Sequence, residues 1–152
     1  MEIFNLDKSH VNEFIDMRIT LFKELGEVNE NDDIISLSKS TKNYFLSNIG
    51  RSLLCWGIKV DNKIVAIASL NLFYRIPYLE NLSGKEGYIL NIYTLPNYRQ
   101  KGMAGKLLNT IIDYAKENGF GRLWLNSSEQ GKSVYVRRGF ETVDNVMELY
   151  IN

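Results

Sequence analysis

Residues 95–108 constrain the fold of this chain more than any other segment, because they join the end of a strand, a glycine-containing turn and the start of a helix. Their sequence is Leu-Pro-Asn-Tyr-Arg-Gln-Lys-Gly-Met-Ala-Gly-Lys-Leu-Leu. Backbone N–H groups in the first helical turn lack intrahelical acceptors, and the helix dipole adds partial positive charge there. Such a junction binds phosphate groups, and Gly102 and Gly105 keep its backbone accessible. Positive side chains at its rim are Arg99, Lys101 and Lys106.

The segments on both sides of this junction have the composition that it requires. Residues 87–95 are nearly all apolar or β-branched, which predicts a strand buried on both faces and closed by Pro96. After the turn, apolar residues recur at three- and four-residue spacing, which predicts an amphipathic helix. Asn118-Gly119 supplies its stop. We therefore expect strand, phosphate-binding turn and helix in this order.

Length and charge exclude several classes of protein. With 152 residues, we expect one domain over residues 1–152. The 18 Lys and Arg balance the 18 Asp and Glu, so we expect neither nucleic acid nor a membrane as a partner. The single cysteine, Cys55, excludes an internal disulfide and a cysteine-based metal cage, and we expect it to be an inert core residue. Without a signal peptide or a long apolar run, the chain is predicted to be soluble and cytoplasmic, with no metal.

The remaining elements follow from their apolar periodicities. The predicted order is strand, helix, helix, three strands, helix, strand, helix and two final strands. Asp61-Asn62 is predicted to form the tight turn of a hairpin, and Ser9 to cap the first helix. The predicted strands are 3–6, 53–60, 63–73, 87–95, 122–126, about 140–142 and 146–151, and the predicted helices begin near residue 9, at 36–49, after Gly102, and at 131–138.

Two motifs resemble those of a known family. The pattern Arg99-x-x-Gly102-x-Ala104 resembles the acyl-coenzyme A fingerprint of the GNAT-type N-acetyltransferases. The second motif is Tyr135 on a short helix, followed by three residues and then Gly139-Phe140, which is similar to the end of that family's domain. The element order resembles the family too. The resemblance implies an α+β fold, with a central, twisted, mostly antiparallel sheet flanked by about four helices, and an enzyme that uses acetyl-CoA.

The resemblance also implies roles for individual residues. Main-chain N–H groups of the turn would hold the pyrophosphate, main-chain groups of the preceding strand would pair with the amide-rich arm of the cofactor, and Tyr135 would act as general acid on the departing thiolate. Ser128 replaces a family asparagine; it either bonds the cofactor arm or caps the helix that begins near Gly131. The implied cofactor-binding residues are Tyr93, Thr94, Leu95, Arg99, Gln100, Lys101, Gly102, Met103, Ala104, Gly105, Lys106 and Ser128.

Proton handling is only partly specified by the sequence. A tyrosine of pKa about 10 cannot fully protonate a thiolate of pKa about 8.5 without a cost of roughly 2 kcal/mol, so Tyr135 is expected to donate a strong hydrogen bond. No general base is assigned. His10 has the position of a cap or a surface residue, and Glu80 and Glu86 are interpreted as solvated surface carboxylates. Arg137-Arg138 is interpreted as a solvated face.

The resulting hypothesis is an N-acetyltransferase that transfers the acetyl group from acetyl-CoA to a primary amine of a small molecule or peptide by direct attack in a ternary complex. The alternative is a non-catalytic acyl-CoA-binding regulatory module. The loop 75–85 and the two N-terminal helices are expected to shape the acceptor pocket, with Asn91 and Tyr93 on one strand face lining it. The apolar segment 146–151 either pairs across a homodimer or forms an inner strand.

Overall fold

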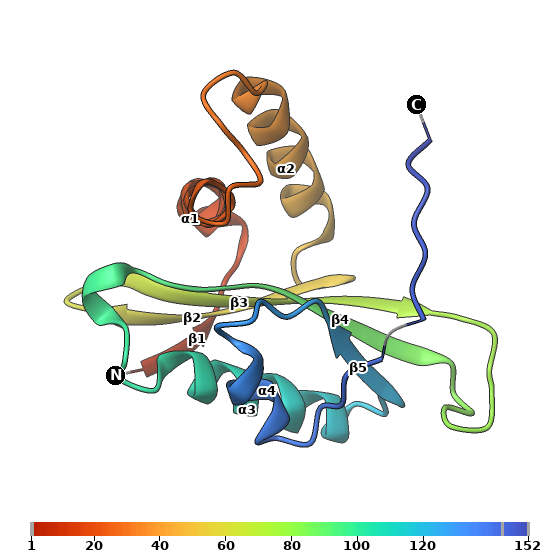
Figure 1. Cartoon of the computed structure of the whole chain (residues 1–152). Helices are drawn as coiled ribbons and strands as arrows, with labels where there is room; N and C mark the ends of the chain where they lie inside the picture. Colours follow the sequence, from red (N-terminus) through yellow and green to blue (C-terminus); the bar gives the residue numbers. More distant parts are fainter. Residues whose placement is uncertain (1, 144, 152) are drawn as a thin grey trace.

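The computed structural model, which describes residues 2–143 and 145–151, is built around one five-stranded sheet (Figure 1). The spatial order is β1-β2-β3-β4-β5. The pairs β1–β2, β2–β3 and β3–β4 are antiparallel. The pair β4–β5 is parallel, so these two strands are joined by a crossover helix, α3 (Met103–Glu117). The strands are β1 (Glu2–Asn5), β2 (Leu53–Val60), β3 (Lys63–Tyr74), β4 (Lys85–Thr94) and β5 (Arg122–Leu125).

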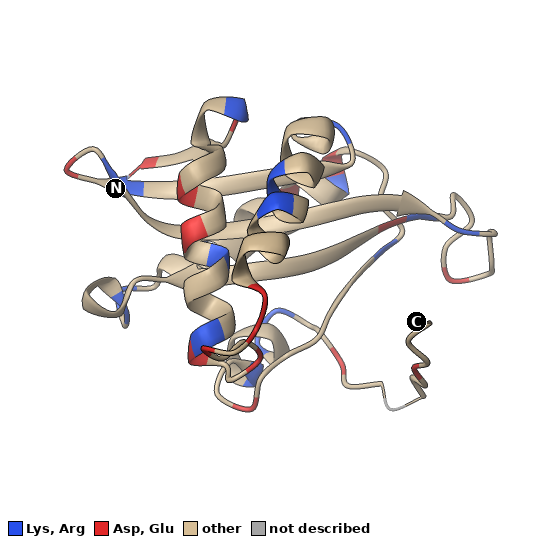
Figure 2. Cartoon of the chain, turned by 90° about the horizontal axis from the view of Figure 1, so that it is seen from above, with Lys and Arg blue, Asp and Glu red and all other residues tan. Residues whose placement is uncertain are grey.

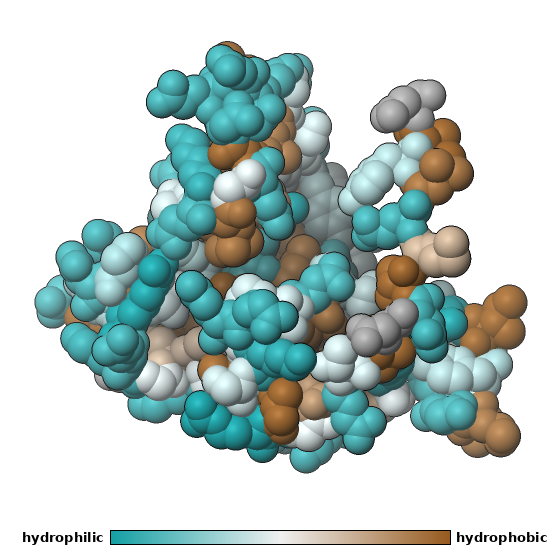
Figure 3. Space-filling model, viewed as in Figure 1, coloured by the Kyte–Doolittle hydropathy of each residue, from teal (hydrophilic) through white to brown (hydrophobic). Residues whose placement is uncertain are grey.

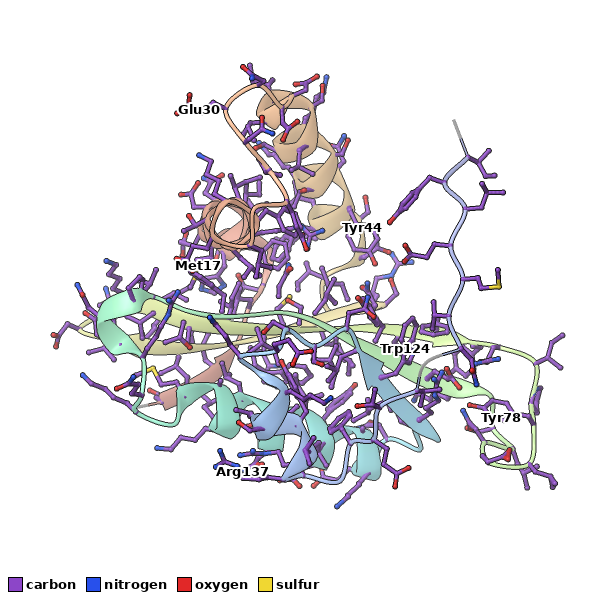
Figure 4. The ribbon with its side chains drawn as sticks, in the orientation of Figure 1. Met17, Glu30, Tyr44, Tyr78, Trp124 and Arg137 are labelled. Atoms are coloured by element: carbon purple, nitrogen blue, oxygen red, sulfur yellow. The ribbon has the colours of Figure 1, made fainter. Side chains whose placement is uncertain are left out.

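Helices cover both faces of the sheet. In Figure 1, α1 (Val11–Glu24) and α2 (Ile34–Asn48) lie on one face, and α3 and the short α4 (Lys132–Val136) lie on the other. Two apolar clusters fill these layers: one packs Phe14 and Phe45 against the sheet, and the other packs the inner side of α3 against it. Figure 4 shows Met17 of α1 in the first layer. The predicted α+β architecture is confirmed.

Two predicted turns are confirmed by backbone angles. Asp61 and Asn62 have φ of 49° and 62°, the left-handed values that a two-residue hairpin turn needs, and Val60 pairs with Lys63 across it. Gly119, just after α3, has φ of 74°, and the Asn118 N–H bonds back to the Tyr114 carbonyl at 3.0 Å. These positions favour Asx and glycine because other side chains clash there.

The helix caps differ from the prediction. Asp7, and not Ser9, opens the first helical segment: its side chain accepts the Ser9 N–H, and His10 bonds back to the Asp7 N–H at 3.0 Å. A 3-10 turn, η1 (Lys8–His10), precedes α1. The expected capping role of His10 is confirmed. At α2, Asp33 accepts the Ser36 N–H at 2.9 Å, so this helix begins two residues before its predicted start.

The two final strands predicted around 140–142 and 146–151 are absent from the described part of the chain. Residues 145–151 run in extended form away from the sheet, on the side of the sheet that carries α1 and α2 (Figure 1). A run of apolar residues shows that a segment needs burial, but a strand also needs a partner edge, and no described strand pairs with this one. We name residues 140–151 the C-terminal arm.

Candidate active site

Strand β4 splits away from β5 halfway along its length. The parallel pairing runs only from Glu86 opposite Arg122 to Ile89 opposite Leu125. Just after this point β4 bulges: Leu90 pairs with Ser69 and Tyr93 with Ile67, so two residues of β4, Asn91 and Ile92, oppose the single Ala68. Asn91 has φ of 54°. The bulge leaves a wedge between β4 and β5 in which main-chain groups of β4 have no strand partner in the described structure.

The direction of the main-chain N–H groups of β4 in the wedge follows from the hydrogen bonds between β4 and β3. The Leu95 N–H donates to the Val65 carbonyl at 2.9 Å. Because ladder bonds alternate along an antiparallel strand, the Thr94 N–H points the other way, into the wedge. Of the three residues expected to pair with a cofactor arm, Thr94 therefore offers its N–H, whereas the Leu95 N–H is already bonded to β3.

The turn between β4 and α3 has the open backbone that phosphate binding needs. After the 3-10 turn η2 (Pro96–Tyr98), Gln100 and Gly102 have φ of 63° and 78°. Gly102 is the N-cap residue of α3, and no side chain accepts a hydrogen bond from the first turn. The Lys106 N–H donates to the Gly102 carbonyl at 3.0 Å, which is the first main-chain bond of the helix. A Cβ on Gly102 would meet no atom within 4 Å. No side chain caps the first turn of α3, and the space beside Gly102 is open; phosphate binding there stays a prediction.

Gly105 lies against the side chain of Arg138. A Cβ there would lie 2.5 Å from the guanidinium of Arg138, which follows α4, so this glycine makes room for an arginine; its predicted contact with a cofactor stays a prediction. Arg138 also donates to Asn109 Oδ1 at 2.7 Å and to the Val134 carbonyl at 2.9 Å. The interpretation of Arg138 as solvated is wrong, because it ties α4 to α3. Arg137 is exposed at the outer side of α4 (Figure 4).

Arg99 faces the end of α1. Its Nη2 donates to Glu24 Oε2 at 2.8 Å, and its Nε donates to the Thr94 carbonyl at 2.8 Å. Tyr93 donates to the other oxygen of Glu24 at 2.6 Å, and burial together with this bond raises the pKa of Tyr93 to about 12. The side chains of Arg99 and Tyr93 therefore fix α1 against β4, and their contact with a cofactor stays a prediction.

Tyr135 lies on α4, half-buried at the α3 side of the sheet. Its ring packs edge to face on Phe140, with centroids 6.0 Å apart, and its carbonyl accepts the N–H groups of Arg138 and Phe140. Gly139, with φ of 95°, makes this return possible, which explains the Gly-Phe pair after the tyrosine. Among the described residues, none accepts a hydrogen bond from its hydroxyl. Burial raises the pKa of Tyr135.

Ser128 closes the turn that leads into α4. Its Oγ accepts the Gly131 N–H at 3.1 Å, and its carbonyl accepts the same N–H at 3.2 Å. Of the two roles left open by the sequence, the structure thus contains the bond that orders the start of this helix. A contact of Ser128 with a cofactor stays a prediction.

Glu86 is the centre of a buried polar cluster, so its interpretation as a solvated surface carboxylate is wrong. Its side chain is 0% exposed and contacts Arg122 at 3.1 Å and Arg75 at 3.6 Å. Although burial raises the pKa of Glu86, hydrogen bonds from Tyr78, Arg122 and Asn81 outweigh it and leave the pKa below its usual value. The cluster holds the loop 75–84, which carries Tyr78 at the far end of the sheet (Figure 4).

The cavity best suited to an acceptor lies between α1, α2 and the sheet, and has a volume of about 350 Å³. Its apolar walls are Phe14, Leu37, Leu53 and Leu90. Asn91 also lines it, because the bulge turns two consecutive residues of β4 toward the same face. The loop 75–85 does not reach this cavity, contrary to expectation, since its residues are held at the other end of β4 by Glu86. Tyr93, expected to line the pocket with Asn91, bonds Glu24 of α1 and does not line this cavity.

Further properties of the described residues bear on the possible functions of the protein. Cys55 is buried, its sulfur 3.3 Å from Ser69 Oγ, and burial raises its pKa to about 12, which agrees with an inert core residue. In residues 2–143 and 145–151, no set of three or more His, Cys, Asp and Glu is arranged to hold a metal ion. Within the same ranges, no helix combines the length and apolar character needed to cross a membrane. In Figure 2, α1 carries charges of both signs, whereas the charged side chains of α2 are lysines.

Comparison with known proteins agrees with this geometry. Residues 20–140 match the family model described as the acetyltransferase (GNAT) family. The chain belongs to this GNAT family. A solved structure of a predicted acetyltransferase from Clostridium acetobutylicum, determined with acetyl-CoA, is 28% identical, with a TM-score of 0.89 over 98% of this chain and 95% of that chain. A GCN5-related N-acetyltransferase from Ralstonia eutropha shares the fold, with a TM-score of 0.88 and 23% identity over 99% and 97% of the two chains.

A sequence relative from Bacillus subtilis is the uncharacterized N-acetyltransferase YhfO, 36% identical over 69 residues. The matched stretch spans 43% of this chain and 46% of that protein, which is just under half of its length. The family motifs singled out in the sequence, Arg99-x-x-Gly102-x-Ala104 and Tyr135 with Gly139-Phe140, lie within the matched family region. The recognition of the family from these motifs is therefore confirmed.

Proposed function

We propose that this protein transfers the acetyl group of acetyl-CoA to a primary amine of a small molecule or peptide by direct attack in a ternary complex. The observation that carries the proposal is the proximity of two unoccupied sets of main-chain donors: the wedge between β4 and β5, and the uncapped first turn of α3. A linear thioester with a diphosphate fits this arrangement, because extended main chain binds amides and a helix N-terminus binds phosphate.

The proposed donor site uses the main chain more than side chains. N–H groups from Gln100 to Gly105 hold the diphosphate, with Gly102 leaving room for it and Lys101 at the rim, whereas the Lys106 N–H is bonded within the helix. The Thr94 N–H, directed into the wedge, bonds the arm of the donor or polarises its thioester oxygen. Arg99 acts indirectly, since it holds the Thr94 carbonyl and Glu24. The donor supplies an activated acetyl group as a thioester.

In the proposed reaction, the amine nitrogen forms a bond to the acetyl carbon, the carbon–sulfur bond breaks, and the electron pair leaves with sulfur. The amine loses one proton to water, and the thiolate gains one on release, so amide and free thiol are the products. Tyr135 donates a hydrogen bond to the thiolate. Its raised pKa makes full proton transfer still less favourable than for a free tyrosine, so this hydrogen bond is its main contribution.

Two further parts of the proposal concern the state of the protein. We propose a homodimer, supported by the exposed apolar side chains of the C-terminal arm, and a cytoplasmic location, supported by the single buried thiol. Nucleic acid is not among the proposed partners, because the chain has no net charge.

The test of the function combines binding with turnover. We expect calorimetry with acetyl-CoA to show saturable binding, acetyl-CoA to raise the melting temperature, and a broad panel of amines to include one that releases free thiol from acetyl-CoA. Binding without turnover of any amine would favour the non-catalytic acyl-CoA-binding module. Absence of binding at millimolar acetyl-CoA would contradict both functions.

A further inference from the structure

The cavity between α1, α2 and the sheet contains an arginine without a carboxylate partner. Arg18, in the middle of α1, lines the cavity. Among the described residues, the ion pairs within 4 Å involve Arg75, Arg99, Arg122 and His10, but not Arg18. None of the residues that line the cavity is an aspartate or a glutamate. The guanidinium therefore lies against a concave surface without a negative group to balance it.

The position of Arg18 is fixed by neutral groups. Its Nη1 donates to Asn91 Oδ1 at 2.6 Å, and its Cζ lies 4.5 Å from the centroid of the Phe22 ring. Burial lowers the pKa of Arg18, which Glu27 partly offsets from a distance, yet arginine stays charged at neutral pH. A guanidinium has five N–H donors, and one of them is bonded here to a described side chain. Arg18 is only half-buried, and its remaining N–H groups are available to a ligand that enters the cavity.

A second donor in the same wall is also unmatched. Asn91 Nδ2 is buried and has no hydrogen-bond partner in the described structure. Leaving such an atom without a hydrogen bond typically costs about 1–3 kcal/mol of folding stability. The backbone of Asn91 is also left-handed at the bulge, which is unfavourable for a residue other than glycine. Three other polar side chains of the wall have partners: the Tyr44 hydroxyl donates to Asn71 Oδ1 at 2.9 Å, and the Thr41 hydroxyl to the Leu37 carbonyl at 2.7 Å. Donors therefore exceed acceptors at Arg18 and Asn91.

We infer that the acceptor amine carries a carboxylate, which binds Arg18 in this cavity. This inference rests on the proposed acetyl transfer and adds the chemical class of the acceptor. The cavity of about 350 Å³ has the size of a small-molecule site, so the acceptor is a small amino acid-like molecule. Asn91, which orients Arg18, lies three residues before Thr94, whose N–H is directed into the wedge, so the cavity and the proposed donor site are neighbours along β4.

The experiment compares matched pairs of amines. The probes are the common L-amino acids, β-alanine and γ-aminobutyrate, each with its neutral methyl amide, and phosphoethanolamine as a phosphate-bearing amine. Thiol release from acetyl-CoA is measured for each. We expect at least one carboxylate to be used with kcat/KM at least about tenfold above that of its amide. Equal use of carboxylates and amides, or preference for phosphoethanolamine, would overturn the inference.

Variants of the cavity wall test the role of Arg18. Arg18→Gln should lower kcat/KM for the preferred carboxylate by roughly 30-fold, mostly through KM, and leave its amide unchanged. Arg18→Lys should restore part of this loss. Asn91→Asp should give a similar loss without removing the arginine, because it supplies a competing carboxylate where Arg18 already bonds. Arg51→Gln, at an exposed arginine outside the cavity, is the matched control and should have no effect.

The two proposals fail in different ways. If amides are acetylated but carboxylates are not preferred, acetyl transfer stands and the assignment of Arg18 is wrong. If Arg18→Gln lowers kcat/KM equally for a carboxylate and its amide, the arginine is structural and the inference is also overturned. If no amine of either kind releases thiol while acetyl-CoA binds in calorimetry, the proposed acetyl transfer itself fails. Melting temperatures of all variants confirm that each compared protein is folded.

Discussion

At the scale of single residues, burial sets the acid–base properties of Tyr135 and Cys55. The Tyr135 hydroxyl has no bonded partner in the described structure and a raised pKa, while Cys55 is enclosed beside Ser69 with a pKa of about 12. Both effects arise because a low-dielectric surrounding disfavours the charged form. The first residue can therefore donate a hydrogen bond at neutral pH, and the second cannot act as a nucleophile.

Replacing Tyr135 with phenylalanine tests the hydrogen bond to the thiolate. A hydrogen bond to a charged group contributes about 1.5–3 kcal/mol, so kcat should fall roughly 10- to 100-fold. The dissociation constant for acetyl-CoA should change little, since the ring and its packing on Phe140 remain. Steady-state kinetics and calorimetry give the two quantities. An unchanged kcat would mean that Tyr135 is only a packing residue.

The thiol of Cys55 should be unreactive in the native protein. With a pKa of about 12, a negligible fraction is thiolate at pH 8, and the side chain is buried. A thiol-specific colorimetric reagent should detect no thiol in the native state and one per chain after unfolding in guanidinium. Rapid labelling of the folded protein would show that the site opens. Cys55→Ser should leave acetyl transfer unchanged.

At the scale of elements, function depends on how the ends of helices and strands are held. The turn between β4 and α3 is open and uncapped, whereas the opposite end of β4 is anchored through Glu86 to the loop and to β5. Because one end of β4 is anchored through Glu86 and the other end separates from β5, β4 can be rigid and still expose main-chain N–H groups in the wedge. Each end offers a substitution with a matched control.

Gly102→Ala should impair both stability and acetyl-CoA binding. Left-handed backbone costs a non-glycine residue about 1–2 kcal/mol, and the new Cβ would occupy the open side of the turn. Binding should weaken by about tenfold or more, equal to about 1.4 kcal/mol. Gly119→Ala is the control, since Gly119 has φ of 74° and equally open surroundings at the other end of α3. Equal loss of binding in both variants would contradict the proposed site.

Glu86→Gln should destabilise the fold in a pH-dependent way. Removing the charge leaves two arginines without their carboxylate, which costs about 3 kcal/mol of unfolding free energy at pH 7. Because the pKa of Glu86 is lowered in the folded state, its stabilisation is present above roughly pH 4.3 and is lost as the pH falls through the lowered value. Urea unfolding of both proteins should therefore converge at acid pH. Glu80→Gln, at an exposed position of the same loop, should have little effect.

At the scale of the whole molecule, exposed apolar side chains gather at one end. In the C-terminal arm, Met147 is 96% exposed and Ile151 85%, and in the loop 75–84 both Ile76 and Leu79 are 88% exposed. Figure 3 shows brown side chains on this side of the molecule. A second cavity, of about 700 Å³, lies between the arm, α4 and β5. Surfaces of this kind are usually covered by another protein chain.

We expect the full chain to be a dimer, with the arm of one copy packed on the other. Light scattering after size exclusion should give twice the mass of the chain, and the double change Met147→Glu with Leu149→Glu should give the monomer. The exposed Glu148→Gln, between the two positions, serves as the control and should stay dimeric. A monomeric full-length protein over a wide concentration range would contradict this prediction.

The sequence determined those features that depend on local chemistry. The hairpin turn at Asp61-Asn62, the glycine turn before α3 and the Tyr135 motif with Gly139-Phe140 require particular residue types at particular backbone angles, so the family and the fold could be predicted from them. The direction of Arg99, the burial of Glu86 and the position of Arg18 could not, because a charged side chain does not specify its partner.

Tertiary structure decided those partners. Glu24 lies 75 residues from Arg99, and Asn91 lies 73 residues from Arg18. Only the packing of α1 on β4, together with the bulge that turns Asn91 to the helix side, brings these groups together. The arm shows the converse case, since its apolar pattern predicted a strand but no described edge pairs with it. A pattern of side chains states what must be buried, whereas the surface that buries it is a property of the assembled fold.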